Sequence, residues 1–167
     1  ARPAALNATA VNVHEVLDHV LTLAKRIPEG QKVSYAKVYD PSLPPVLADS
    51  EKLTQVILNL VRNAVDATTG VEKAQIALET GVASMRLRAR SGRSRPLARI
   101  AIRDNGPGIR PEMMHRLFTP FATSKAQGTG LGLAVSRRIV LAHGGRIEVR
   151  NHPSGGAEAA VYLPLDI

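Results

Sequence analysis

The sequence contains no cysteine and no tryptophan, and its aromatic residues are limited to three tyrosines and two phenylalanines. Without cysteine, disulfide bonds and thiolate metal sites are excluded, and a reducing cytoplasm is the expected location. With so few aromatic rings, the core must be built from valine, leucine, isoleucine and alanine. No run of eighteen apolar residues occurs, so we expect no membrane-spanning helix.

The length of the chain limits the number of domains it can form. At 167 residues there is room for one ordinary domain with a real core, but hardly for two. The chain opens with Ala1, Arg2 and Pro3, without an initiator methionine, a charged leader or an apolar signal segment. We therefore interpret the sequence as a piece cut from a longer protein.

Positive charge is in excess, with a formal net charge of +8 and a pI near 10.4. An excess of this kind can indicate a nucleic-acid or phosphate partner. However, the arginine surplus is concentrated between Arg86 and Arg103, where few aromatic residues are available to stack on bases. We expect a solvated or partner-facing edge there, and no nucleic-acid binding.

Hydrophobic periodicity divides the chain into helices and strands. Helical spacing predicts long helices at residues 11–27, 50–68 and 131–143, and a short one at 111–117. Alternating runs predict strands at residues 33–40, 75–80, 82–90, 97–103, 146–149 and 157–163. This order predicts an α+β fold, a two-layer sandwich with helices packed on one face of a mixed β-sheet.

The helix predicted at residues 50–68 carries an unusual pair of asparagines. Asn59 and Asn63 lie four residues apart and project side by side, with Asp66, from the face opposite the apolar stripe. Asparagine is a mediocre helix former because its amide competes for backbone hydrogen bonds. The pair is either part of a solvated polar face or a pair of amide oxygens facing a nucleotide-bound Mg²⁺, which takes oxygen ligands.

Two glycine-rich segments follow. Residues 104–108 (Asp-Asn-Gly-Pro-Gly) come directly after a predicted strand, where a carboxylate can accept a hydrogen bond from an exocyclic amine such as that of adenine. Glycines there let the backbone approach a flat ring, although the segment is also a good turn sequence. Residues 128–133 (Gly-Thr-Gly-Leu-Gly-Leu) open a helix, whose free N–H groups favour phosphate oxygens. They form neither a Walker A loop nor a dinucleotide fingerprint.

In this order the three motifs resemble the asparagine box and the two glycine boxes of the histidine-kinase branch of the Bergerat-fold ATPases. Phe118 and Phe121 match the phenylalanine box of that branch, and the resemblance extends from about residue 11 to residue 165. It implies the Bergerat fold, with a catalytic ATP-binding domain at residues 11–167. It also implies a linker from an upstream dimerisation domain at residues 1–10 and a long ATP lid at about 105–130.

The resemblance implies ATP and Mg²⁺ as cofactors and assigns roles to individual residues. Asn63 would be the Mg²⁺ ligand and Asn59 its neighbour near the transferred phosphate, which makes these two the catalytic residues. Asp104 would bind the adenine amino group. The rest of the implied nucleotide-binding set comprises Asp66, Gly106, Gly108, Ile109, Phe121, Lys125, Gly128, Thr129, Gly130, Leu131 and Gly132.

Position 59 distinguishes the branches of this superfamily on chemical grounds. In the gyrase, chaperone and mismatch-repair ATPases the matching residue resembles a glutamate that activates water, and an amide cannot accept that proton. Asn59 therefore favours a kinase that transfers the γ-phosphate of Mg-ATP to a histidine. Such transfer depends on positioning, Mg²⁺ and charge neutralisation. A hydrolytic ATPase or an ATP-sensing module is the alternative.

The acceptor histidine is missing from this chain. His14 and Glu15 superficially resemble a phosphoacceptor motif, but the next residues do not continue it, and we interpret all five histidines as structural or solvated. The implied partners are the dimerisation domain of the same kinase, which carries the acceptor, and the receiver domain of a response regulator. We expect the fragment to be monomeric and the full-length protein to be a homodimer.

Two features concern the subfamily. Ala157 stands where the family usually has a threonine that helps to hold adenine; the missing hydroxyl would weaken that contact by about 0.5–1.5 kcal/mol unless water replaces it. Residues 13–17, residues 39–44 and the arginine-rich segment before Asp104 resemble NtrB-type nitrogen-sensing kinases. The same segments can also be read as a common helix and turn shared with related kinases.

Overall fold

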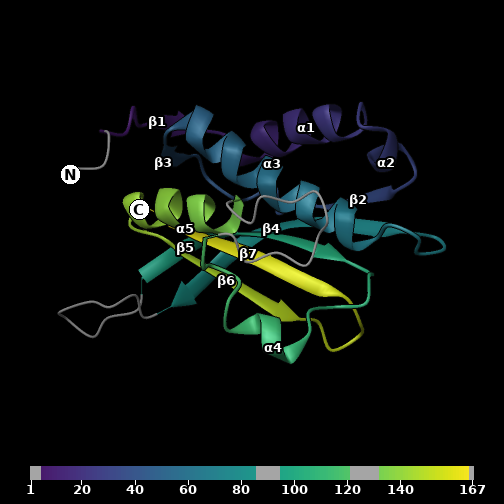
Figure 1. Ribbon diagram of the computed structural model, residues 1–167. Helices are drawn as coiled ribbons and strands as arrows, with labels where there is room; N and C mark the ends of the chain where they lie inside the picture. The colour runs from purple at the N-terminus through teal and green to yellow at the C-terminus, as the bar shows by residue number, and fades with distance from the viewer. Residues whose placement is uncertain (1–4, 86–94, 121–131, 166–167) are drawn as a thin grey trace.

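The computed structural model of the protein describes residues 5–85, 95–120 and 132–165. Helices form one layer and a β-sheet forms the other (Figure 1). The elements in chain order are β1 (Thr9–Val11), α1 (Val13–Ala24), α2 (Pro28–Gln31), β2 (Ser34–Val38), β3 (Val46–Ala48), α3 (Ser50–Ala67), β4 (Gln75–Met85), β5 (Arg95–Asp104), α4 (Pro111–Met114), α5 (Gly132–Ala142), β6 (Arg146–Asn151) and β7 (Ala157–Pro164).

The main sheet has the strand order β2-β4-β5-β7-β6. The pair β2 and β4 is parallel and the other pairs are antiparallel, so the sheet is mixed. A separate antiparallel ladder joins β1 to β3. Helices α1, α3 and α5 lie on one face of the main sheet (Figure 1), which confirms the predicted α+β two-layer sandwich.

The core lies between the helices and this face of the sheet, and it is aliphatic as predicted. Leu17 of α1 and Ile57 and Leu60 of α3 pack against strand residues such as Ile76 and Ile100, all at most 2% exposed. Burial of each such side chain contributes about 1.5–3 kcal/mol. No helix within the described ranges is long and apolar enough to cross a bilayer.

Helix α3 is capped by Asp49, whose carboxylate accepts from the backbone amides of Asn7 at 3.1 Å and Lys52 at 3.2 Å. These two hydrogen bonds lower the pKa of Asp49, because they favour the charged form. At the other end Thr68 Oγ1 donates to the carbonyl of Val65 at 2.9 Å. Both ends of the helix that carries the asparagine pair are therefore fixed.

His14 and His143 have contacts that are structural, a role expected from the sequence for histidines of this chain. His143 Nε2 accepts from the backbone amide of Asp49 at 3.0 Å, and its Nδ1 lies 2.8 Å from the carbonyl of Ile139. Since a carbonyl only accepts, Nδ1 carries the proton. His14 stacks on Tyr39 with ring centroids 4.6 Å apart. His143 thus ties the end of α5 to the start of α3.

The structure differs from the sequence-based expectation in several elements. The expected helix at residues 11–27 begins only at Val13, because the preceding residues form β1. The expected strand at 75–80 and the described part of the one at 82–90 are a single strand, β4, and residues 86–90 lie outside the described residues. Gly81 pairs with Arg99 without interrupting the ladder. Strand β1 begins at Thr9, within the segment expected to be a linker. The division into a linker and a catalytic domain stays a prediction.

Candidate functional site

The polar face of α3 meets the first turn of α5. Asn59 is half-buried, and its Nδ2 donates to the fully buried Ser136 Oγ at 3.4 Å. Gly132, the first residue of α5, lies against the same side chain: a Cβ built on it would be 3.8 Å from Asn59 Cγ. The structure therefore brings the asparagine motif to the end of the second glycine motif, two segments far apart in the sequence.

Asn63 and Asp66 continue along α3. Asn63 is half-buried and lies one turn after Asn59, on the same face of the helix. Asp66 is exposed and lines a hollow of about 300 Å³, whose other lining residues are Ile27, Glu29, Arg62 and Val65. The structure thus places Asn63 with Asn59, and Asp66 at the hollow beside α2.

Asp104 ends β5 on the helix-covered face of the sheet and is only 6% exposed. Its Oδ1 accepts from the backbone amides of Gly106 at 2.9 Å and Ala157 at 3.3 Å. Among the described residues, both hydrogen bonds to this carboxylate go to Oδ1, which leaves Oδ2 for a further donor. A nearly buried carboxylate with one oxygen available fits the recognition of an amino group such as that of adenine.

The segment after Asp104 packs against the end of α3. A Cβ on Gly106 would collide with the carbonyl oxygen of Ala67, so only glycine allows this approach. Gly108 has a φ of +83° and Ile109 is half-buried. The predicted adenine-binding residues therefore lie beside the helix that carries Asn59 and Asn63.

Part of the predicted site lies outside the described residues: Phe121, Lys125, Gly128, Thr129, Gly130 and Leu131. The described part of the expected lid, residues 105–120, contains α4. Phe118 packs against the core, and the guanidinium of Arg137 lies 5.5 Å from the centroid of its ring. The extent of the lid stays a prediction.

The candidate site offers oxygen atoms of the kind that bind Mg²⁺. Within the described ranges no group of three or more histidine, cysteine, aspartate or glutamate side chains could hold a metal ion. Mg²⁺ is commonly bound through one or two protein oxygens together with substrate phosphates. The amide oxygen of Asn63 could serve as such a protein ligand to Mg²⁺.

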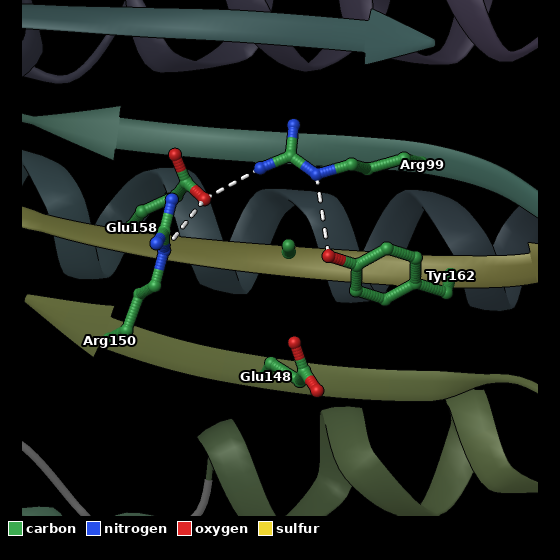
Figure 2. Close-up of a pocket in the computed structure, with 6 residues that line it drawn as sticks. Arg99, Glu148, Arg150, Glu158 and Tyr162 are labelled. Atoms are coloured by element: carbon green, nitrogen blue, oxygen red, sulfur yellow. Dashed lines mark hydrogen bonds and ion pairs between the residues drawn. The ribbon is translucent and has the colours of Figure 1, made fainter. Parts of the chain in front are cut away.

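The opposite face of the sheet carries a charge network that sequence analysis missed. Glu158, only 4% exposed, accepts through one oxygen from Arg99 at 2.6 Å and Arg150 at 3.4 Å (Figure 2). Arg99 Nε also donates to the hydroxyl of Tyr162 at 3.4 Å. These residues line a hollow of about 270 Å³ together with Glu148 and Ala160, so two arginines face two glutamates there and their formal charges balance. Asp104 faces the other layer, because side chains alternate along β5.

Comparison with known proteins gives the family. The family described as "Histidine kinase-, DNA gyrase B-, and HSP90-like ATPase" matches residues 48–167. The "Sensory histidine kinase/phosphatase NtrB" of Escherichia coli O157:H7 is 41% identical over 155 residues, which cover 92% of this chain and 43% of that protein. The chain therefore spans less than half the length of this relative.

Solved structures agree with this assignment. The catalytic domain of histidine kinase ThkA matches with a TM-score of 0.78 and 28% identity, over 95% of this chain and 96% of that one. ThkA in complex with the response regulator protein TrrA matches with a TM-score of 0.72 and 26% identity, over 94% of this chain and 41% of that one. Full-length ShkA in complex with AMPPNP matches with a TM-score of 0.77 and 30% identity, over 98% of this chain and 32% of the ShkA chain.

These similarities confirm two expectations from the sequence. The fold is that of histidine kinase catalytic domains, and the resemblance to NtrB-type kinases holds over most of the chain. Since the family matches well over half of the residues, the chain belongs to the histidine kinase-, DNA gyrase B- and HSP90-like ATPases, as an ATP-binding domain of the sensor histidine kinase type.

Proposed function

We propose that this domain transfers the γ-phosphate of Mg-ATP to a histidine on a separate dimerisation domain of a two-component sensor kinase. The observation that carries the proposal is the meeting of Asn59 with Gly132 on one side of α3 and the packing of Gly106 against Ala67 at its end. Together they place the Asp104 segment and the N-terminus of α5, which suits phosphates, beside the helix that carries the amides of Asn59 and Asn63.

The site residues have distinct roles in this proposal. Asp104 binds the adenine amino group through Oδ2, while Gly106, Gly108 and Ile109 shape the adenine pocket. Asn63 ligates Mg²⁺, and Asn59 lies beside the transferred phosphate. The remaining nucleotide contacts are Asp66 and Gly132 together with Phe121, Lys125, Gly128, Thr129, Gly130 and Leu131. Mg-ATP supplies the phosphoryl group, and the protein binds and orients it.

Nucleotide binding by a similar protein supports the choice of ATP, since the ShkA structure contains AMPPNP. The ThkA complex supports a response regulator as the second partner. In the proposal the full-length protein is a homodimer, the isolated domain is a monomer, and nucleic acid is not a partner. The absence of cysteine and the use of ATP fit a cytoplasmic domain.

A transfer assay tests the proposal. The domain is incubated with γ-labelled ATP, Mg²⁺ and the separately produced dimerisation domain of the same kinase. We expect label on a histidine of that domain and little release of free phosphate, because Asn59 cannot act as a general base. Steady phosphate release without labelled histidine would support the hydrolytic alternative. If ATP neither binds nor raises the melting temperature, both alternatives are wrong.

A further inference from the structure

Asn151, the last residue of β6, binds both backbone groups of Ile109. Its Oδ1 accepts from the Ile109 amide at 2.7 Å, and its Nδ2 donates to the Ile109 carbonyl at 2.9 Å. The carboxamide thus donates one hydrogen bond to Ile109 and accepts one from it, although the two residues are 42 positions apart. A residue on a neighbouring antiparallel strand exchanges the same two hydrogen bonds. We call this pair of hydrogen bonds the Asn151 clasp.

The clasp constrains the residue next to it as well. A Cβ built on Gly108 would lie 2.9 Å from Asn151 Oδ1, and the φ of Gly108 is +83°. Glycine is therefore favoured at position 108, because its backbone is in the left-handed region and a Cβ would displace the carboxamide of Asn151. Gly108 and Asn151 form one unit that determines the path of the chain after Asp104.

The turn that follows Asn151 holds the other end of the same segment. His152 donates its amide to the carbonyl of Gly156 at 2.8 Å, which closes the turn. Gly156 packs against the carbonyl of Asp104 so tightly that a Cβ would collide with it. The next amide, that of Ala157, donates to Asp104 Oδ1. The connection from Asn151 at the end of β6 to Ala157 at the start of β7 therefore contacts both Ile109 and Asp104, the last and first residues of the proposed adenine-binding segment.

We infer that Asn151 is a positioning residue for adenine, which acts through Ile109 and not by touching the nucleotide. This inference rests on the proposed function, because it takes residues 104–109 as the adenine-binding segment. With the clasp in place, Ile109 is held in one backbone conformation before the base arrives. Without it, binding of adenine has to fix that backbone as well, so nucleotide affinity falls.

The test compares Asn151→Ala with Asn7→Ala in the isolated domain. Asn7→Ala removes another exposed carboxamide, from a residue whose contact with Asp49 is made by its backbone amide. Calorimetric titration gives the Kd values for ATP, ADP and GTP in the presence of Mg²⁺. We expect Asn151→Ala to raise the Kd for ATP and ADP by the same factor, about tenfold, which corresponds to about 1.4 kcal/mol. Asn7→Ala should change neither value.

Two further measurements separate positioning from a general loss of stability. Hydrogen exchange at the Ile109 amide should become faster in Asn151→Ala, and the preference for ATP over GTP should decrease. A folded Asn151→Ala domain with unchanged ATP affinity and unchanged nucleotide preference would overturn the inference. If Asn151→Ala does not fold, Asn151→Asp replaces it, since the carboxylate retains the acceptor for the Ile109 amide and removes the donor.

The parent domain distinguishes this inference from the proposed function. If the parent does not bind ATP, the proposed function fails and the clasp has no nucleotide to position. If the parent binds ATP and Asn151→Ala binds it equally well, only the role of Asn151 is wrong. In transfer assays the clasp variant should show a raised KM for ATP and an almost unchanged kcat, because Asn59 and Asn63 are untouched.

Discussion

The backbone amide of Ala157 donates to Oδ1 of Asp104 at 3.3 Å. Position 157 is also where the sequence lacks the threonine hydroxyl expected from the family resemblance. The contact to Asp104 is made by the backbone, so it does not depend on the side chain at this position. The missing hydroxyl therefore leaves the orientation of the Asp104 carboxylate intact.

Restoring the hydroxyl should strengthen nucleotide binding. We expect Ala157→Thr to lower the Kd for ADP about two- to tenfold, the gain of one hydrogen bond of about 0.5–1.5 kcal/mol. Ala157→Val is the matched control, because valine has the shape of threonine without its hydroxyl. Calorimetric titration of both variants checks the prediction, and equal affinities for threonine and valine would contradict it.

Asn63→Ala should abolish phosphotransfer while leaving the domain folded. Loss of the proposed Mg²⁺ ligand removes electrostatic stabilisation of the transferred phosphate, so we expect transfer to fall on the order of 100-fold or more. Asn63→Asp keeps an oxygen ligand for Mg²⁺ but adds a negative charge beside the phosphates, so we expect it to be similarly inactive. Gln55→Ala, an exposed carboxamide on the same helix, is the control. Transfer of label to the dimerisation domain is the measurement, and undiminished transfer by folded Asn63→Ala would refute the assigned role.

Asp104→Ala should lose selectivity for adenine. Its Oδ2 is the proposed acceptor for the adenine amino group, whereas guanine presents a carbonyl at the corresponding position. We expect the ratio of the GTP and ATP Kd values to fall towards one, mainly through weaker ATP binding. Competition binding with the two nucleotides measures this ratio, and a preference equal to that of the parent would exclude Asp104 from base recognition.

Much of this site could be predicted from sequence because its residues form local motifs. Asn59 and Asn63 share a helix face that periodicity alone predicts, and residues 104–108 follow a strand whose end is evident from the pattern. The Gly106 contact with Ala67 could not be predicted, because the glycine was expected to let the backbone approach a flat ring and gave no indication that it would pack against the end of α3. Asn151 gave no comparable signal, since a polar residue at the end of a strand is typical of any turn.

The elements that escaped prediction are short or depend on distant partners. Strands β1 and β3 have three residues each, too few for an alternating pattern to emerge, and they are held by each other. Gly81 suggested a break in β4, but its pairing with Arg99 continues the strand. The network around Glu158 joins three strands, and sequence alone does not give their register.

Acid should weaken the cap of α3. The amides of Asn7 and Lys52 lower the pKa of Asp49, so the folded state favours its carboxylate more than the unfolded chain does. This stabilisation is complete above the unfolded pKa, near 3.8, and is lost as pH falls through the lowered folded pKa. The difference in melting temperature between the parent and Asp49→Asn should therefore shrink as the pH is lowered from 6 to 3.

The control for this pH dependence is Glu51→Gln, which changes an exposed carboxylate in the same first turn. The difference in melting temperature between the parent and Glu51→Gln should vary less between pH 6 and pH 3. If the melting temperatures of the parent and Asp49→Asn differ by the same amount from pH 6 to pH 3, the titration of Asp49 does not contribute to stability.

Glu158→Ala should destabilise the domain without affecting nucleotide affinity. Glu158 is nearly buried, and its removal leaves Arg99 and Arg150 without their shared acceptor. We expect the free energy of unfolding to fall by about 1–3 kcal/mol. Glu148→Ala breaks a more exposed pair with Arg146, 2.6 Å long, and should cost less than about 1 kcal/mol. Urea denaturation measures both. A changed ATP affinity in Glu158→Ala would show that the two faces of the sheet are coupled.

The β1–β3 ladder has a mechanical consequence for the domain. Strand β3 ends at Ala48, directly before the cap residue Asp49, and Asn7, just ahead of β1, donates to that same carboxylate. Pulling residues 7–11 away would separate the ladder and remove the Asn7 hydrogen bond from the Asp49 carboxylate, which would then cap α3 through Lys52 alone. Residues 7–11 and helix α3 are thus linked through the carboxylate of Asp49, so a force applied to these residues is transmitted to the start of the helix that carries Asn59 and Asn63.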